Sequence, residues 1–137
     1  MDPKKILLVD DDRDLVSVLK FRLEQKGYAV QCAYKGTEVF VRLDEERPDL
    51  IILDVMMPEM DGFEALKRLR GNGETSSIPV ILLTAKTQYK DVAHGYALGA
   101  DYYMTKPFTS TQLLLAVSAL ITGRKPEGPQ TKPITCA

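Results

Sequence analysis

The sequence predicts an α/β domain in which a five-stranded parallel sheet is covered by helices on both faces. Five short apolar runs alternate along the chain with segments whose apolar residues recur at helical spacing. Most of these runs are continuously apolar, a pattern typical of strands that are buried on both faces. Such alternation implies right-handed crossovers between parallel strands, which place helices on both sides of the sheet.

The expected strands are short and rich in Val, Ile and Leu, as buried strands are. In chain order they cover residues 6–9, 28–33, 50–53, 80–84 and 102–104.

The segments between the strands, and the one after the last, show helical spacing of apolar residues. The stripes that identify the first three are Leu15, Val18, Leu19 and Leu23; Val39, Phe40 and Leu43; and Phe63, Leu66 and Leu69. The fourth segment, 88–98, is less regular because it contains His94 and Gly95, and the fifth, 113–121, is apolar almost all round. Glycines 27, 71, 73 and 99 stand where helices should end.

Composition limits the classes of function. The chain has 137 residues, of which 45% are hydrophobic and 27% charged, so one compact domain is expected. Its 18 Lys and Arg nearly balance its 19 Asp and Glu, so no overall field favours nucleic acid or an anionic membrane. Partners must therefore be inferred from local sites.

The cysteines and the two ends of the chain indicate a cytoplasmic protein. Cys32 and Cys136 lie too far apart in sequence to suggest a metal cluster or a disulfide framework, which fits a reducing compartment. Only four apolar residues precede Asp10, too few for a signal peptide or a membrane span. Residues 123–137 are rich in Pro and Gly, so we expect a folded domain over 1–122 followed by a flexible tail or linker.

Polar residues gather where the expected strands end. Asp10, Asp11 and Asp12 follow the first strand and Asp54 ends the third, while Thr84 ends the fourth and Lys106 follows the fifth. Because ligands of open parallel sheets bind at the carboxyl ends of the strands, these groups should share one site. An Asp after a strand often only caps a turn or a helix, and we expect that role for Asp12.

Clustered carboxylates need a cation, because they otherwise raise one another's pKa. Lys106 offers one, and a hard divalent metal suits carboxylate and carbonyl oxygens. Asp10, Asp11 and Asp54, with the backbone carbonyl of Met56, are therefore predicted to form a magnesium-type site. A carboxylate beside a metal and a lysine can also act as a nucleophile that accepts a phosphoryl group.

These segments resemble the response-regulator receiver domain of two-component signalling. The resemblance covers about residues 4–122 and rests on four motifs in family order, which are "ILLVDDD" (6–12), "LIILDVMMPEMDG" (50–62), "PVILLTA" (79–85) and "GADYYMTKPF" (99–108). It implies a CheY-like, flavodoxin-like (βα)5 fold with strand order 2-1-3-4-5.

The resemblance also implies a role for each matching residue. Asp54 would accept a phosphoryl group from a sensor histidine kinase or phosphotransfer protein. Asp10, Asp11 and the carbonyl of Met56 would help Asp54 hold Mg²⁺, with Mn²⁺ as an alternative. Lys106 would pair with the phosphate and precede a cis bond to Pro107, while Thr84 and Tyr103 would form a switch pair in which the aromatic ring swings inward. Such domains catalyse only their own phosphorylation and dephosphorylation, so no turnover enzyme is expected.

The same resemblance directs the output to the face formed by the fourth helix, fifth strand and fifth helix, whose partner is unknown. Family members that dimerise there through ion pairs commonly carry an acid at the position of Tyr102 and basic residues on the fifth helix. This chain has neither, so an apolar homodimer or another docked protein is expected instead. No direct contact with nucleic acid or membrane is expected.

Three other interpretations fit the residues less well. A phosphatase of the haloacid dehalogenase type would need an aspartate two residues after its nucleophile, where this chain has Met56. A flavin carrier would need a phosphate loop after the first strand, where this chain has three acids. A receiver used only as an interaction module is disfavoured because every residue that the chemistry needs is present. His94 is expected to be a solvated side chain, and the side chains of Met56, Met57 and Met60 are expected to pack within the loop.

Overall fold

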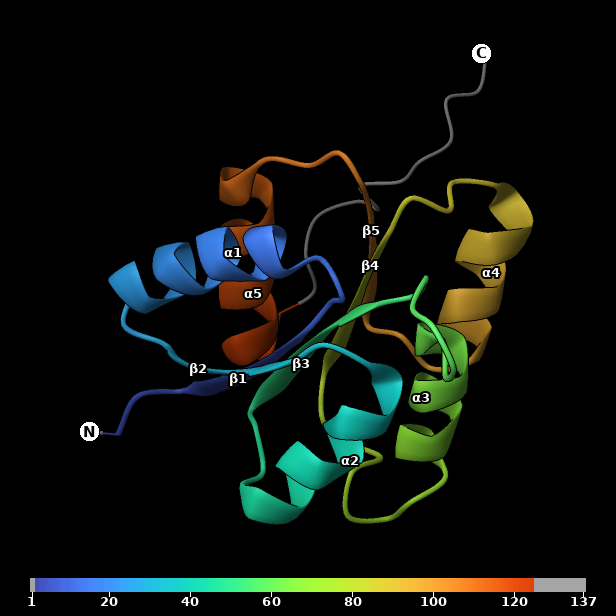
Figure 1. The fold of residues 1–137 in the computed structure, drawn as a ribbon, viewed down its shortest axis with the longest axis horizontal. Helices are drawn as coiled ribbons and strands as arrows, with labels where there is room; N and C mark the ends of the chain where they lie inside the picture. The colour runs from blue at the N-terminus through green and yellow to red at the C-terminus, as the bar shows by residue number, and fades with distance from the viewer. Residues whose placement is uncertain (1, 125–137) are drawn as a thin grey trace.

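The computed structural model describes residues 2–124, and Figure 1 shows how its elements are arranged. The tail expected over 123–137 therefore lies outside the described residues from position 125 onward, as does Cys136. Within the described part, no helix is long and apolar enough to cross a membrane.

Strands and helices alternate from one end of the described chain to the other. In order they are β1 Lys5–Val9, α1 Arg13–Gln25, β2 Ala29–Ala33, α2 Gly36–Glu45, β3 Leu50–Asp54, α3 Gly62–Arg70, β4 Val80–Thr84, α4 Tyr89–Ala97, β5 Tyr102–Thr105 and α5 Ser110–Ile121.

The strands form one parallel sheet in the order β2-β1-β3-β4-β5, which confirms the predicted fold class. Val9 at the end of β1 pairs with Ala33 of β2 and Leu53 of β3. Asp54 pairs with Leu83 of β4, and Thr84 in turn pairs with Thr105 of β5. The register therefore brings all the strand ends to one edge of the sheet, where the predicted site residues stand.

Two apolar layers enclose the sheet. In Figure 1, α1 and α5 lie on one side of it, and α2, α3 and α4 lie on the other. Because side chains alternate along a strand, Tyr102 packs into the core under α1 and α5 while Tyr103 packs into the core under the other three helices. The two neighbouring tyrosines therefore occupy opposite faces of the sheet.

Local chemistry accounts for several helix boundaries. The Asp12 carboxylate accepts a hydrogen bond from the N–H of Leu15 at 3.1 Å and caps α1, as predicted. Helix α5 begins at Ser110, before its first apolar residue, because Thr109 and Gln112 form a reciprocal capping box. Gly99 ends the α4 segment with φ of 105°, a conformation that side chains with a Cβ disfavour.

Helix α5 is buried along only part of its surface. Leu113, Ala116 and Val117 are buried, whereas the side chain of Leu115 is 67% exposed. The apolar character of this helix therefore exceeds what packing on the sheet requires.

Gly62 ties the fold to the strand ends, because the first turn of α3 lies directly on the end of β3. A Cβ at position 62 would overlap the carbonyl oxygen of Asp54 and lie 2.7 Å from the Cα of Val55. Both neighbours are backbone atoms, which cannot move without disturbing the strand end.

We therefore expect Gly62→Ala to lower the free energy of unfolding by about 3 kcal/mol, measured by urea denaturation. Gly73→Ala is the matched control, because a Cβ there meets nothing within 4 Å. Equal stability of the two variants would contradict the close approach of α3 to β3.

Candidate functional site

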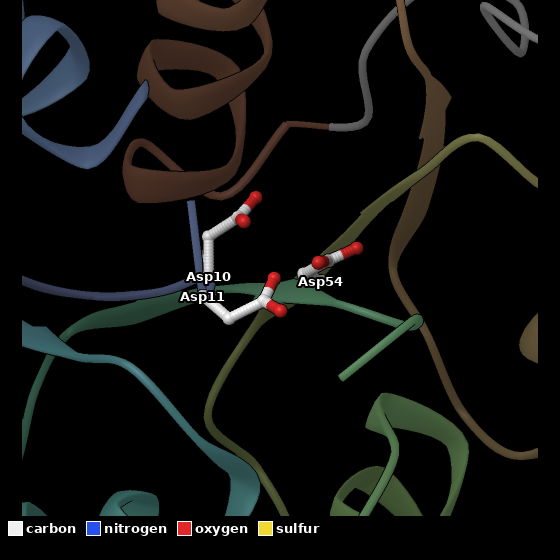
Figure 2. Close-up of side chains that lie close together, drawn as sticks. All are labelled: Asp10, Asp11 and Asp54. Carbon is white, nitrogen blue, oxygen red and sulfur yellow. The ribbon is translucent and has the colours of Figure 1, made fainter. Parts of the chain in front are cut away.

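Three aspartates meet at the carboxyl edge of the sheet. Figure 2 shows Asp10 and Asp11 where β1 ends and Asp54 at the end of β3. Each has a carboxylate oxygen within 4.8 Å of the others. Asp10 and Asp54 are buried, with 0% and 2% of their surfaces exposed, while Asp11 is exposed. The site thus has a buried floor and a single acid at its rim.

Lys106 lies beside both buried acids. Its Nζ donates to Oδ2 of Asp10 at 2.8 Å and lies 3.7 Å from Oδ2 of Asp54. The other oxygen of Asp10 accepts the N–H of Asp12 at 2.9 Å. In this arrangement Asp10 has its charge matched more closely than Asp54, whose carboxylate accepts only one longer bond, 3.2 Å from the N–H of Met56, among the hydrogen bonds described.

Burial raises the pKa of Asp54 to about 7, and the charges of Asp10 and Asp11 act in the same direction. The charge of Lys106 and the bond from the Met56 N–H oppose that rise without cancelling it. For Lys106, burial lowers the pKa, but the bond to Asp10 and the charge of Asp54 outweigh it, so the net change is upward. Lys106 therefore stays charged, and Asp54 is left sensitive to any added cation.

The donor set suits a hard divalent cation. All the clustered groups are carboxylates. When all three are ionised, Lys106 and one further monovalent cation together would still leave one negative charge unmatched. Carboxylate oxygens are the ligands that Mg²⁺ and Ca²⁺ prefer. Cys32, the free cysteine among the described residues, lies in β2 outside the cluster and makes no soft-metal site with it.

A hydrogen-bonded path leaves the site through β4. Thr84 is buried, and its Oγ1 accepts the N–H of Lys86 at 3.2 Å. The carbonyl of Lys86 accepts the hydroxyl of Tyr103 at 2.9 Å. The ring of Tyr103 is fully buried, and burial followed by the charge of Asp91 raises its pKa to about 12. Thr84 and Tyr103 are thus joined by one loop residue.

The strand end of β5 is also held to β4. The N–H of Lys106 donates to the carbonyl of Thr84 at 2.8 Å, and the peptide bond between Lys106 and Pro107 is cis. The hydrogen bond to Thr84 fixes the backbone of Lys106 at the end of β4.

His94 lies outside the site, as expected, whereas Tyr96 makes a contact that the sequence did not indicate. His94 is exposed on α4, and its ring meets the edge of Phe63 with 4.7 Å between centroids. The hydroxyl of Tyr96 accepts the backbone N–H of Tyr103 at 3.1 Å. No motif or spacing marks Tyr96, because a contact from a helix side chain to a strand backbone leaves no periodic signal.

The chain is similar to known proteins over most of its length. A family model described as "Response regulator receiver domain" matches residues 6–118. The chain is 44% identical over 118 residues to the alkaline phosphatase synthesis transcriptional regulatory protein PhoP of Bacillus subtilis, covering 86% of this chain and 48% of PhoP. It is 41% identical over 123 residues to the phosphate regulon transcriptional regulatory protein PhoB of Rhizobium meliloti, covering 90% of this chain and 54% of PhoB. The chain thus spans about half the length of these two relatives.

Solved structures share the fold over nearly their whole length. The signal receiver domain of a signal transduction histidine kinase from Syntrophus aciditrophicus superposes with a TM-score of 0.82 at 40% identity, covering 98% of both chains. The chemotaxis protein CheY4 of Vibrio cholerae superposes with a TM-score of 0.80 at 34% identity, covering 85% of this chain and 97% of CheY4.

The raised pKa of Asp54 predicts a pH-dependent penalty on folding. The folded state holds the Asp54 proton more tightly than the unfolded state does, so stability falls as pH rises from about 4 to about 7. Without divalent metal, the stability of Asp54→Asn relative to wild type should therefore grow by about 1–2 kcal/mol between pH 5 and pH 8, well below full linkage because the rim is open to water.

Urea denaturation at the two pH values measures this difference, with Asp44→Asn on the exposed face of α2 as the control variant. A stability difference between Asp54→Asn and wild type that stays constant with pH would show that Asp54 is not held in a charge-crowded, buried environment.

Proposed function

We propose that this chain, which belongs to the response regulator receiver domain family, accepts a phosphoryl group on Asp54 and acts as a regulatory switch in two-component signalling. The observation that carries the proposal is the placement of Asp54. Its carboxylate is buried at the strand end, crowded by two other acids and 3.7 Å from the Lys106 ammonium. A carboxylate held in this way is shielded from bulk water and interacts with nearby cations.

The proposed reaction is a phosphoryl transfer from a phosphohistidine. An Asp54 oxygen forms a bond to phosphorus, the phosphorus–nitrogen bond breaks, and its electron pair stays with the imidazole, which takes up a proton. The product is an acyl phosphate on Asp54 and a neutral histidine on the donor. Lys106 stabilises the negative charge on the phosphoryl oxygens, an electrostatic contribution that requires no proton transfer from the lysine.

Asp10, Asp11, Asp54 and the carbonyl of Met56 are the proposed ligands of Mg²⁺, with Mn²⁺ as an alternative. The all-oxygen donor set and the excess negative charge support this assignment. When bound, the metal neutralises charge on the carboxylates and the phosphoryl oxygens. Asp11, at the exposed rim, is the acid that a hydrated ion meets first.

Thr84 and Tyr103 are proposed to change position when Asp54 is phosphorylated. The Thr84 hydroxyl can donate to a phosphoryl oxygen, and its loop neighbour Lys86 already holds the Tyr103 hydroxyl. The family's inward swing of the aromatic ring remains a prediction for this chain, in which the ring of Tyr103 lies buried. The surface of α4, β5 and α5 is the proposed output face. The absence of charged side chains on α5 supports an apolar partner or homodimer over an ion-paired one.

Response regulators interact with histidine kinases and with output domains. We propose that residues 1–122 form the receiver unit, that a sensor histidine kinase or a phosphotransfer protein donates the phosphoryl group, and that the reaction takes place in the cytoplasm. PhoP and PhoB are named as transcriptional regulators, whereas the Syntrophus receiver belongs to a histidine kinase. The output of this chain is therefore proposed to act through a protein partner or an attached domain, with no direct contact of the receiver with nucleic acid.

Intact-mass spectrometry after incubation with acetyl phosphate tests the proposal. Wild type should gain one phosphoryl group in the presence of Mg²⁺, and Asp54→Asn should gain none because the nucleophile is lost. The exposed Asp44→Asn variant should react like wild type. Since some receivers ignore small donors, a phosphorylated sensor kinase is the second donor, and no adduct with either would reject the function.

The neighbouring acids Asp11 and Asp12 provide a matched test of the metal assignment. Asp11→Asn should slow formation of the adduct by at least about tenfold at limiting Mg²⁺, because it removes a proposed ligand. Asp12→Asn should change the rate by less than about twofold, since Asp12 caps α1 and Asn caps almost as well. Equal effects of the two substitutions would refute the assignment of Asp11.

A further inference from the structure

Helix α4 supplies the hydrogen-bond partner of a backbone group on the last strand. β5 lies at the edge of the sheet, where backbone groups have no further strand to pair with. At Tyr103 the N–H instead donates to the hydroxyl of Tyr96, at 3.1 Å. The ring of Tyr96 is tilted against that of Tyr103 with 6.5 Å between centroids. A side chain of α4 thus completes the edge of the sheet at the proposed switch residue.

Gly95 allows the ring of Tyr103 to approach the backbone of α4. A Cβ at position 95 would lie 2.9 Å from Cδ2 of Tyr103 and 2.9 Å from Cδ1 of Leu82. Contacts this short do not occur between real carbon atoms, so a side chain at position 95 would displace the Tyr103 ring or the helix. Two consecutive residues of α4 therefore hold Tyr103. Gly95 packs against the ring of Tyr103, and Tyr96 binds the backbone N–H of Tyr103.

The far end of Tyr103 is held by the loop that follows β4. Its hydroxyl donates to the carbonyl of Lys86, whose N–H donates to Thr84. The contacts therefore run from Thr84 through Lys86 to Tyr103, and from the backbone of Tyr103 to Tyr96 on α4. The path is buried at Thr84 and Tyr103, which are both 0% exposed, and it reaches the surface of α4 at Tyr96, which is 37% exposed.

We propose that Tyr96 is a positioning residue that couples the Thr84–Tyr103 pair to the surface of α4. A backbone N–H at a covered strand edge is costly to leave without an acceptor. When the strand backbone at Tyr103 shifts, α4 must follow it to keep the bond, so a change at the strand ends reaches the helix surface. This inference rests on the proposed function, because the event that shifts Tyr103 is the modification of Asp54.

Tyr96→Phe tests the inference, because it keeps the ring and removes only the hydroxyl. Tyr89→Phe is the matched control, since Tyr89 lies on the same helix with its side chain 66% exposed. The first readout is hydrogen exchange at the Tyr103 amide by NMR, which needs no phosphorylation. Exchange should quicken roughly three- to tenfold in Tyr96→Phe and stay unchanged in Tyr89→Phe. Unchanged exchange in both variants would overturn the inference at the level of the bond.

The second readout is the response of α4 once Asp54 is phosphorylated to the same extent in each protein, as judged by intact mass. The chemical-shift changes of the Val92, Ala93 and His94 amides should be at least about twofold smaller in Tyr96→Phe than in wild type and Tyr89→Phe. Equal or larger changes in Tyr96→Phe would reduce Tyr96 to a structural cap and overturn the coupling. Absence of the Asp54 adduct in wild type would reject the proposed function, and the coupling with it, while the exchange result would still stand on its own.

Discussion

The structure depends on one electrostatic constraint: three carboxylates lie within 4.8 Å of one another at the end of a buried parallel sheet. Two of them are almost fully buried, and such charges persist only beside a cation or with a proton bound. Lys106 matches Asp10 closely and Asp54 only in part, at 2.8 and 3.7 Å. The negative charge that Lys106 leaves unmatched falls on Asp54, and this imbalance favours an added cation at the site.

The rest of the fold keeps those groups in register. Pairing of β1 with β3, and of β3 with β4, sets the strand ends level, and the close approach of Gly62 fixes the turn after Asp54. The hydrogen bond from the Lys106 N–H to Thr84 aligns β5 with β4 at the same edge. Backbone contacts therefore connect the site to β5, and α4 in turn contacts β5 at Tyr103. A helix held at Tyr103 by both ring and backbone contacts can respond to small movements of that residue.

Much of this arrangement could be predicted from the sequence because it follows from pattern. Continuous apolar runs located the five strands to within one residue at each end. Alternation along a strand accounts for the placement of Tyr102 and Tyr103 in opposite cores. What pattern could not predict was which acid Lys106 approaches more closely, since that depends on the packing of two side chains that are 96 residues apart. The hydroxyl of Tyr96 was missed for a similar reason, and α5 starts before residue 113 because its polar capping box adds a turn that apolar spacing does not reveal.

We expect the charge of the buried Asp54 carboxyl to depend on an added cation. The pH titration of the Asp54 carboxyl carbon by NMR, in the absence and in the presence of saturating Mg²⁺, tests this expectation directly. Without the metal we predict a titration midpoint near a pKa of about 7, and with it a lower midpoint, because a divalent charge favours the ionised carboxylate. A midpoint near 4 without metal, or one that Mg²⁺ leaves in place, would rule out a cation-dependent charge on Asp54.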